Sequence, residues 1–316
     1  MNWNPLSAIY GGVVAGRNAL YDRRWLRARA LQGPVISVGN LSVGGSGKTP
    51  FVILLGELLK AREISFDVLS RGYGRRSRGV LLVDPSGLPQ DFGDEPLLIA
   101  RRLQVPVVVG EDRFEAGQFA EKKFGPQIHI LDDGFQHRRL ARDFDVVLVT
   151  PEDARDRLLP AGRLRDPLSA LRRTDVVALT GGAAAESFPL KGKIVWRVRR
   201  GIVAQNIPAS PVVFCGIARP QNFLLQLRTA NVDPVAEAFF RDHHAYSEKD
   251  IRDLLELAKR SDAGGFVTTE KDAVNLGGYL SVLAPLAIVP VKMELADAAN
   301  AVDAMLRVIE ERRVRS

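Results

Sequence analysis

The sequence predicts an α/β fold, with a doubly wound and mostly parallel sheet followed by a second, smaller α/β domain. The first observation is a series of short, nearly continuous apolar runs, which is typical of strands buried on both faces of a parallel sheet. The second is that segments with helical spacing, 51–62, 95–103 and 114–124, alternate with these runs. The predicted strands are Val35–Val38, Phe66–Leu69, Val80–Val83, Val105–Val109, Ile128–Leu131, Val146–Val149 and Val176–Leu179.

The pattern changes near residue 200. Residues 195–203 alternate between polar and apolar side chains, as a connecting strand would. A new set of α/β elements follows between residues 212 and 291. We therefore predict an N-terminal helix in 1–28, a larger domain in 29–200 and a smaller domain in 201–316 that closes over the larger one.

Composition narrows the classes of partner. The 316 residues are 46% hydrophobic and carry a formal net charge of +7, which favours nucleotides, nucleic acids or an anionic membrane surface. We predict no nucleic-acid partner, because the chain has neither zinc-finger spacing nor an RNP-like aromatic motif. A single cysteine, Cys215, excludes an internal disulfide and fits a reducing compartment.

The N-terminal segment is both apolar and basic. Apolar side chains such as Leu6, Ile9 and Val13 recur at helical spacing, and arginines gather from Arg17 to Arg29. Such a helix could lie in a membrane interface, with its arginines on lipid head groups. The alternative is an ordinary amphipathic helix packed on its own domain.

A glycine-rich loop follows the first predicted strand. Residues 39–50 read GNLSVGGSGKTP and lead into a helix. Glycines let backbone N–H groups turn toward phosphate oxygens, and the helix N-terminus adds partial positive charge. The segment is a variant of the P-loop motif, with Ser42 at the first glycine position, and it makes the fold P-loop NTPase-like. The predicted phosphate-binding residues are Ser42, Val43, Gly44, Gly45, Ser46, Gly47, Lys48 and Thr49.

Two adjacent carboxylates, Asp132 and Asp133, follow the apolar run Ile128–Leu131. In P-loop sites an acid at the end of a buried strand holds Mg²⁺ together with the loop Ser or Thr, here Thr49. We favour Asp132 over Asp133 as the metal ligand. A plain Asp-Asp-Gly turn is the alternative when this segment is considered alone.

Further polar clusters follow other predicted strands. Arg71 lies in a flexible basic loop that suits an anionic group, and Asp94 opens a helical stretch, where it is either an N-cap or a catalytic base. The Asp242-His243-His244 run suits acid–base work better than metal binding. Lys271-Asp272 hints at a contact with a nucleotide base.

Taken in order, these segments resemble one family, the tetraacyldisaccharide 4'-kinases of lipid A synthesis. The segments are VGNLSVGGSGKTP, LSRGYGRR, GDEP, LDDGFQHRRL, LLPAGRLRDPLSALRR and the DHH run, and DDGFQHR is the most specific of them. The resemblance implies ATP, Mg²⁺ and transfer of the γ-phosphoryl group to the 4'-hydroxyl of a tetraacylated glucosamine disaccharide 1-phosphate. It also implies a peripheral enzyme on the cytoplasmic face of the bacterial inner membrane, with an anionic membrane surface and the lipid A precursor as partners and no obligate protein partner.

The resemblance also implies roles for single residues. Lys48 handles phosphates, Asp94 takes the proton of the sugar hydroxyl, and His243 tunes or orients Asp94 across the domain cleft. The residues expected to support the site or bind substrate are Arg71, Glu95, Asp133, Gln136 and His137. Two positions depart from the family pattern: Arg163 stands where we expect proline, and Asp166 where we expect glutamate.

Other functions fit parts of the same pattern. A regulatory P-loop NTPase switch would transfer phosphoryl groups only to water, but the N-K-x-D spacing of GTPases is missing. A soluble sugar or nucleoside kinase would not need the basic N-terminal helix. A membrane-binding module without catalysis would leave the combination of Lys48 and Asp132 unexplained.

Overall fold

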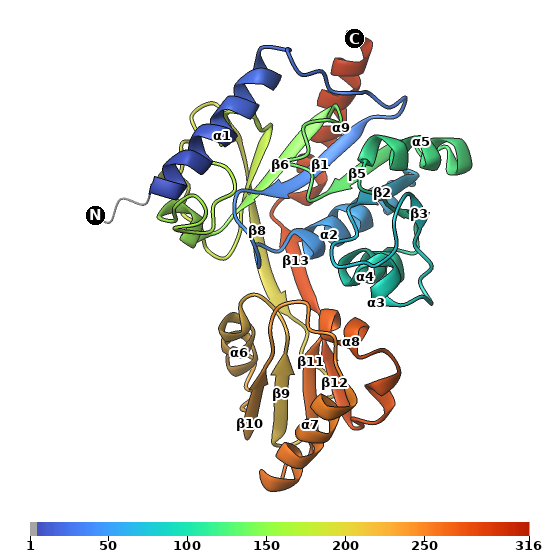
Figure 1. Cartoon of the computed structure of the whole chain (residues 1–316), viewed down its shortest axis with the longest axis vertical. Helices are drawn as coiled ribbons and strands as arrows, with labels where there is room; N and C mark the ends of the chain where they lie inside the picture. The colour runs from blue at the N-terminus through green and yellow to red at the C-terminus, as the bar shows by residue number, and fades with distance from the viewer. Residues whose placement is uncertain (1–4, 316) are drawn as a thin grey trace.

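The computed structural model describes residues 5–315 and shows two α/β lobes, a large one above a small one in Figure 1. The predicted fold class is confirmed. The large lobe holds a nine-stranded sheet in the order β13-β8-β7-β6-β1-β5-β2-β4-β3, antiparallel only where β13 meets β8 and β3 meets β4. Its strands are β1 (Val35–Asn40), β2 (Phe66–Ser70), β3 (Leu81–Leu82), β4 (Val107–Val109), β5 (Ile128–Asp132), β6 (Phe144–Val149), β7 (Val176–Leu179), β8 (Ile194–Ile202) and β13 (Val291–Leu295).

Helices cover both faces of this sheet, because successive side chains of each buried strand point to opposite faces. In β6, Val146 and Leu148 join the apolar cluster under α2, α4 and α9, whereas Val147 and Val149 join a cluster on the other face. The helix α5 packs over the cluster of Leu31 and Val35 on that other face. The helices of the large lobe are α1 (Pro5–Asp22), α2 (Lys48–Lys60), α3 (Pro89–Phe92), α4 (Asp94–Leu103), α5 (Arg113–Phe124) and α9 (Ala298–Val314).

The small lobe is a four-stranded parallel sheet in the order β10-β9-β11-β12. Its elements are β9 (Pro211–Cys215), α6 (Pro220–Thr229), β10 (Ala236–Phe239), α7 (Glu248–Arg260), β11 (Gly265–Thr269), α8 (Glu270–Leu276) and β12 (Leu286–Val289). Only the antiparallel ribbon of β8 and β13 runs from this lobe up into the large sheet (Figure 1).

The C-terminal end differs from the predicted domain bounds. Residues 201–316 were assigned to the smaller domain, but β13 pairs with β8 and α9 packs on the large sheet. Arg312 and Arg313 near the chain end bind Asp175 and Asp143 of the large lobe at 3.2 and 3.0 Å. Residues 291–314 therefore belong with the large lobe, since their apolar side chains are buried there.

The topology brings three loops to one place. The strands β1, β5 and β2 are neighbours and parallel, so the loops that leave their carboxyl ends meet at the same edge of the sheet. The phosphate loop follows β1, Asp132 ends β5, and Ser70 ends β2.

The helix α1 packs on the large lobe through buried Val14 and several polar side chains. Ser7 and Tyr10 donate to the carbonyl oxygens of Leu158 and Arg165, both at 3.1 Å, and Asn18 donates to Asp166 at 3.0 Å. The apolar side chains on the other side of the helix remain exposed: Leu6 is 61%, Ile9 64% and Val13 67% accessible. None of the helices between residues 5 and 315 combines the length and apolar character that a membrane crossing requires.

Candidate active site

A cleft of about 650 Å³ lies between the two lobes, within the size range of small-molecule sites. Most of the residues predicted from the sequence line it. They are Val43, Gly44, Gly45, Ser46, Gly47, Lys48, Thr49, Arg71, Asp94, Glu95, Asp132, Asp133 and His243. Ser42, Gln136 and His137 are absent from the lining and lie behind it.

The phosphate loop has the backbone that its glycines allow. Gly44, Gly45 and Gly47 have φ angles of 71°, 63° and 86°, in the left-handed region that side chains disfavour. A side chain at Gly47 would also collide with Met293 of β13. The helix α2 starts at Lys48 with no side-chain cap, so its first N–H groups point toward the cleft without a competing partner.

Lys48 and Asp133 form an ion pair across the mouth of this loop, with Nζ and Oδ1 3.6 Å apart. Arg165 binds both carboxylate oxygens of Asp133, at 2.7 and 3.0 Å. Burial raises the pKa of Asp133, but Lys48 and Arg165 outweigh it and bring the pKa below its usual value. Asp133 is therefore a permanent carboxylate that positions the lysine.

Asp132 has the opposite environment. One oxygen accepts a hydrogen bond from Ser70 at 3.0 Å, and the other is buried and unpartnered among the described residues. Burial raises the pKa of Asp132, and the charges of Glu95 and Asp133 raise it further. A cation bound at this oxygen would offset the cost of burying its charge.

These residues fit Mg²⁺. That ion takes few protein ligands and completes its shell with water and phosphate oxygens, so Asp132 and the Thr49 hydroxyl suffice. In the part of the chain that the structure describes, no cluster of three or more acidic, His or Cys side chains could form a complete metal site.

A second polar cluster crosses the cleft. His243 Nδ1, from the small lobe, lies 2.9 Å from each carboxylate oxygen of Asp94, at the start of α4. Burial raises the pKa of Asp94, but the hydrogen bond from His243 and the charge of Lys271 lower it below its usual value. Burial lowers the pKa of His243, and Asp94 outweighs that effect, so the pKa of the imidazole is raised.

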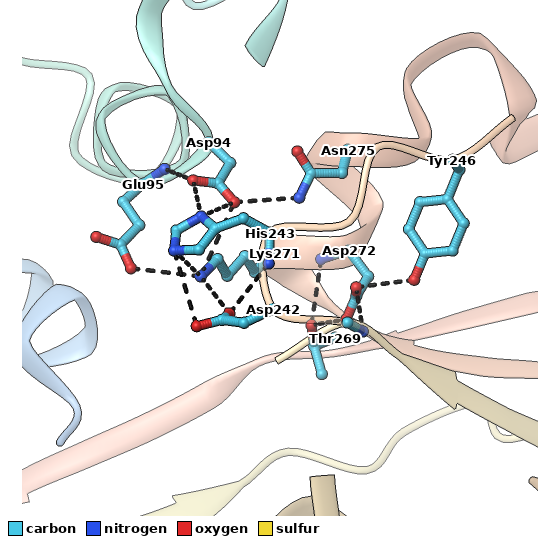
Figure 2. A network of polar contacts seen from close by, with 10 residues as sticks. Asp94, Glu95, Asp242, His243, Tyr246, Thr269, Lys271, Asp272 and Asn275 are labelled. Carbon is cyan, nitrogen blue, oxygen red and sulfur yellow. Dashed lines mark hydrogen bonds and ion pairs between the residues drawn. The ribbon is translucent and has the colours of Figure 1, made fainter. Parts of the chain in front are cut away.

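Lys271 lies beneath the histidine ring in Figure 2, between Glu95 and Asp242. Its ammonium is 3.1 Å from both Asp242 Oδ1 and His243 Nε2, and 3.5 Å from Glu95 Oε1. An ammonium only donates, so a neutral His243 accepts at Nε2 and keeps its proton on Nδ1, facing Asp94. Lys271 thus selects the tautomer that donates to the carboxylate.

The helix α8 carries this lysine and is held firmly. Asp272, buried in the small lobe, accepts hydrogen bonds from the Gly216 N–H at 2.7 Å and the Tyr246 hydroxyl at 2.8 Å (Figure 2). On the same helix, Asn275 donates to Asp94 at 3.1 Å. The sequence suggested that Lys271 and Asp272 contact a nucleotide base. In this structure Lys271 contacts His243, and Asp272 holds the helix that carries the lysine, so both support the Asp94–His243 contact.

Gln136 and His137, predicted from the sequence, lie outside the cleft lining, and Gln136 links the end of β1 to the loop that holds Asp166. Gln136 donates to the carbonyl oxygen of Asn40 at 2.9 Å and to Asp166 at 3.0 Å. Asp166 is fully buried, so the shorter acid at this position still makes contacts. Burial and the charge of Arg113 lower the pKa of His137 to about 4, which keeps that ring neutral.

Sequence reasoning missed several residues that line the cleft, Tyr73, Arg165, Arg200, Arg219 and Arg241. It also missed Asn275, which contacts Asp94. The basic loop at 159–167, part of the LLPAGRLRDPLSALRR segment, includes Arg165, but the sequence gave it no target. Tyr73 lies in the LSRGYGRR segment, where only Arg71 was singled out. The remaining residues belong to no motif and reach the cleft only through the tertiary fold.

The fold and this arrangement define a P-loop phosphotransferase: a phosphate loop with its lysine, a carboxylate placed for a metal, and an Asp–His pair on the facing wall. A family model described as tetraacyldisaccharide-1-P 4'-kinase matches residues 2–310. The chain belongs to this family of lipid-sugar kinases, and the resemblance drawn from its motifs is confirmed.

The relatives span the same length. A tetraacyldisaccharide 4'-kinase of Koribacter versatilis (strain Ellin345) is 51% identical, over 98% of this chain and 99% of the relative. One from Aquifex aeolicus (strain VF5) is 38% identical, over 89% and 91%. The crystal structure of LpxK from Aquifex aeolicus in complex with ATP superposes with a TM-score of 0.79 at 35% identity, covering 96% of this chain and 98% of that one.

The two neighbouring carboxylates should respond differently to neutralisation. Asp132→Asn removes the buried oxygen charge that suits a metal, so we expect the dependence of ATP affinity on Mg²⁺ to be largely lost. Asp133→Asn releases Lys48, so we expect ATP to bind about 10-fold or more weakly with its Mg²⁺ dependence kept. Calorimetric titrations of ATP with and without Mg²⁺ measure both effects; the reverse pattern would assign the metal to Asp133.

Proposed function

We propose that this chain transfers the γ-phosphoryl group of ATP to the 4'-hydroxyl of a tetraacylated glucosamine disaccharide 1-phosphate, a step of lipid A biosynthesis. The observation that carries the proposal is the Asp94–His243 contact of 2.9 Å on the wall of the cleft that holds the phosphate loop. A hydrolytic switch needs only a positioned water, whereas a kinase needs a base for its acceptor hydroxyl. Family membership does not favour the switch or a soluble sugar kinase.

In the proposed reaction, Asp94 accepts the proton of the acceptor hydroxyl while that oxygen bonds to the γ-phosphorus. The bond from the γ-phosphorus to the bridging oxygen breaks, and ADP leaves with that electron pair. His243 holds the carboxylate in place through Nδ1–H, and Lys271 keeps the histidine in the required tautomer. Lys48 stabilises the charge of the transferring phosphoryl group, and Asp133, itself held by Arg165, keeps the lysine in position.

A bound Mg²⁺ would neutralise phosphate charge, and Asp132 and Thr49 are the residues placed to hold it. The protein's own contribution is mainly positioning and charge complementarity. The lowered pKa of Asp94 keeps the base ionised near neutral pH.

The outward apolar face of α1 supports a membrane location. A helix that packs on its own protein usually buries its apolar face, but this helix buries only Val14 fully, half-buries Ser7 and Tyr10, and exposes Leu6, Ile9 and Val13. The exposed Trp25 and the arginines after it suit an interface with anionic lipid. We therefore place the protein at the periphery of the membrane, on the cytoplasmic face of the bacterial inner membrane, where a tetraacylated acceptor would be embedded.

The reaction itself is tested by supplying labelled ATP and the lipid disaccharide in mixed detergent micelles. We expect label on the lipid, and about a 10²- to 10⁴-fold loss of turnover for Asp94→Ala. Release of free phosphate alone, at the same rate with and without lipid, would contradict the proposed function.

The pH dependence of turnover reports on the Asp–His pair. The pair accepts a proton only when His243 is neutral, so turnover should fall as pH drops through the raised pKa of that histidine. The charge of Lys271 lowers the pKa of His243, so Lys271→Met should move the acidic limb to higher pH. Lys292→Met removes a lysine that is 64% exposed and pairs with Glu294 outside the cleft, and it serves as the control. An acidic limb that stays in place in Lys271→Met would show that the lysine does not act on the histidine.

Vesicle flotation tests the role of α1. Replacing Leu6, Ile9 and Val13 by serine should strongly reduce binding to vesicles with anionic lipid, because the apolar area is lost. Leu225→Ser on α6 is a matched control, since Leu225 is 65% exposed on the small lobe. Equal binding by the triple variant and the control would rule out α1 as the contact.

A further inference from the structure

We propose that Arg219, with Arg200 beside it, forms a second phosphate-binding element that lies over the phosphate loop and grips the polyphosphate of the nucleotide. The inference rests on the proposed use of ATP and deepens it. Neither arginine belongs to a motif of the sequence, and the two reach the cleft from different parts of the fold. Arg200 lies on the connecting strand β8, and Arg219 immediately precedes α6 in the small lobe.

Arg219 lies directly against the glycine loop. A Cβ atom at Gly45 would come within 3.0 Å of Arg219 Cγ and Cδ and 3.1 Å of its Nε. The neighbouring Ala218 approaches Gly44 in the same way, at 3.0 Å. The loop therefore needs glycine here for two reasons, its backbone φ and the closeness of this arginine.

The guanidinium of Arg219 is only partly paired. Its Nη1 contacts Glu152 Oε2 at 3.0 Å, while Nε and Nη2 are buried and have no hydrogen-bond partner among the described residues. These N–H groups and the amides of the glycine loop are all donors, and they lie close together because Arg219 packs against Gly45. A phosphate oxygen is the group that satisfies both sides, and the planar guanidinium suits it well.

Arg200 adds a second positive charge. It lines the same cleft, its Nε is buried without a partner, and no ion pair is seen for it within residues 5–315. Burial lowers the pKa of Arg200, and the charge of Arg219 lowers it further, with no carboxylate opposing. Both half-buried guanidiniums line the same cleft, and only Arg219 has an acidic partner, Glu152. The excess positive charge is one that an anion would neutralise.

Position favours the nucleotide over the phosphate of the acceptor as the source of that anion. Arg219 lies over Gly45, within the loop that wraps the nucleotide phosphates, whereas the Asp94–His243 pair that would meet the acceptor lies on α4 and the small lobe. Because Arg219 belongs to the small lobe and Gly45 to the large one, a polyphosphate between them would also hold the lobes together.

The test is calorimetric titration with ATP and with AMP, both without any acceptor, on the full-length protein. We expect Arg219→Ala to weaken ATP binding about 10- to 100-fold and to change AMP binding about 2-fold or less, because AMP lacks the β- and γ-phosphates. Arg219→Lys keeps a charge without the planar fork and should lie between these values. Arg200→Gln should weaken ATP binding in the same direction.

Two controls separate this role from general damage. Glu152→Gln removes the partner of Arg219 and keeps the arginine, so ATP should bind as well as in the wild type or better. Arg228→Ala removes an arginine of α6 that is 55% exposed and pairs with Glu237 on the surface. We expect it to leave binding unchanged.

Wild-type ATP affinity in both Arg219→Ala and Arg219→Lys would overturn the proposal. So would unchanged nucleotide binding combined with a raised KM for the lipid acceptor, which would assign the arginines to the acceptor phosphate. Since the titration contains no acceptor, its result is independent of whether the lipid is the true substrate.

Discussion

The contact between Asp94 and His243 is the interaction on which this active site depends. It joins residues 149 positions apart, from the first turn of α4 in one lobe and a loop of the other. Only the ribbon of β8 and β13 connects the lobes covalently, so the relative position of the lobes must be set by contacts across the cleft (Figure 1). Asp94 is buried and charged. From the small lobe, His243 and Asn275 donate hydrogen bonds to it, and the ammonium of Lys271 lies 3.9 Å away as an ion pair.

Some charged groups around the phosphate loop are paired with each other and others are not, and the unpaired ones suit a metal–nucleotide complex. Asp133 is fully paired with Lys48 and Arg165, so it is structural in the absence of ligands. Asp132, its neighbour, keeps one buried oxygen without a donor, and Arg200 and Arg219 keep buried N–H groups without acceptors. A metal–nucleotide complex would supply a cation for Asp132 and an anion for Arg200 and Arg219, and its binding would offset the cost of keeping these charged groups buried.

Much of the fold was predictable because its signals are local. The apolar runs identify the strands of the parallel sheet, and the GNLSVGGSGKTP segment identifies the phosphate loop and the start of α2. The return of the chain to the large sheet was not predictable in the same way. Residues 291–295 alternate in burial like many edge strands, and nothing local says that they pair with β8 rather than with the neighbouring β12.

The site shows the same limit. The candidates Asp94 and His243 came from motifs, and their pairing came from resemblance to a family, since spacing alone cannot bring distant loops together. Lys271 was noticed for its position after a strand, but its place beneath His243 depends on the helix α8 that Asp272 anchors. No sequence motif pointed to Arg219. It packs against Gly45, where the absence of a side chain leaves room for the arginine, and a sequence does not show that kind of contact.

The most direct test of the account is a double-mutant cycle on turnover with Asp94→Ala, His243→Ala and the combined variant, using the lipid acceptor. If the two residues act as one unit, the combined variant should be about as slow as the slower single variant, with ATP affinity close to wild type in all three. Losses that multiply, as for independent residues, would contradict the central claim that the interlobe pair is the working base.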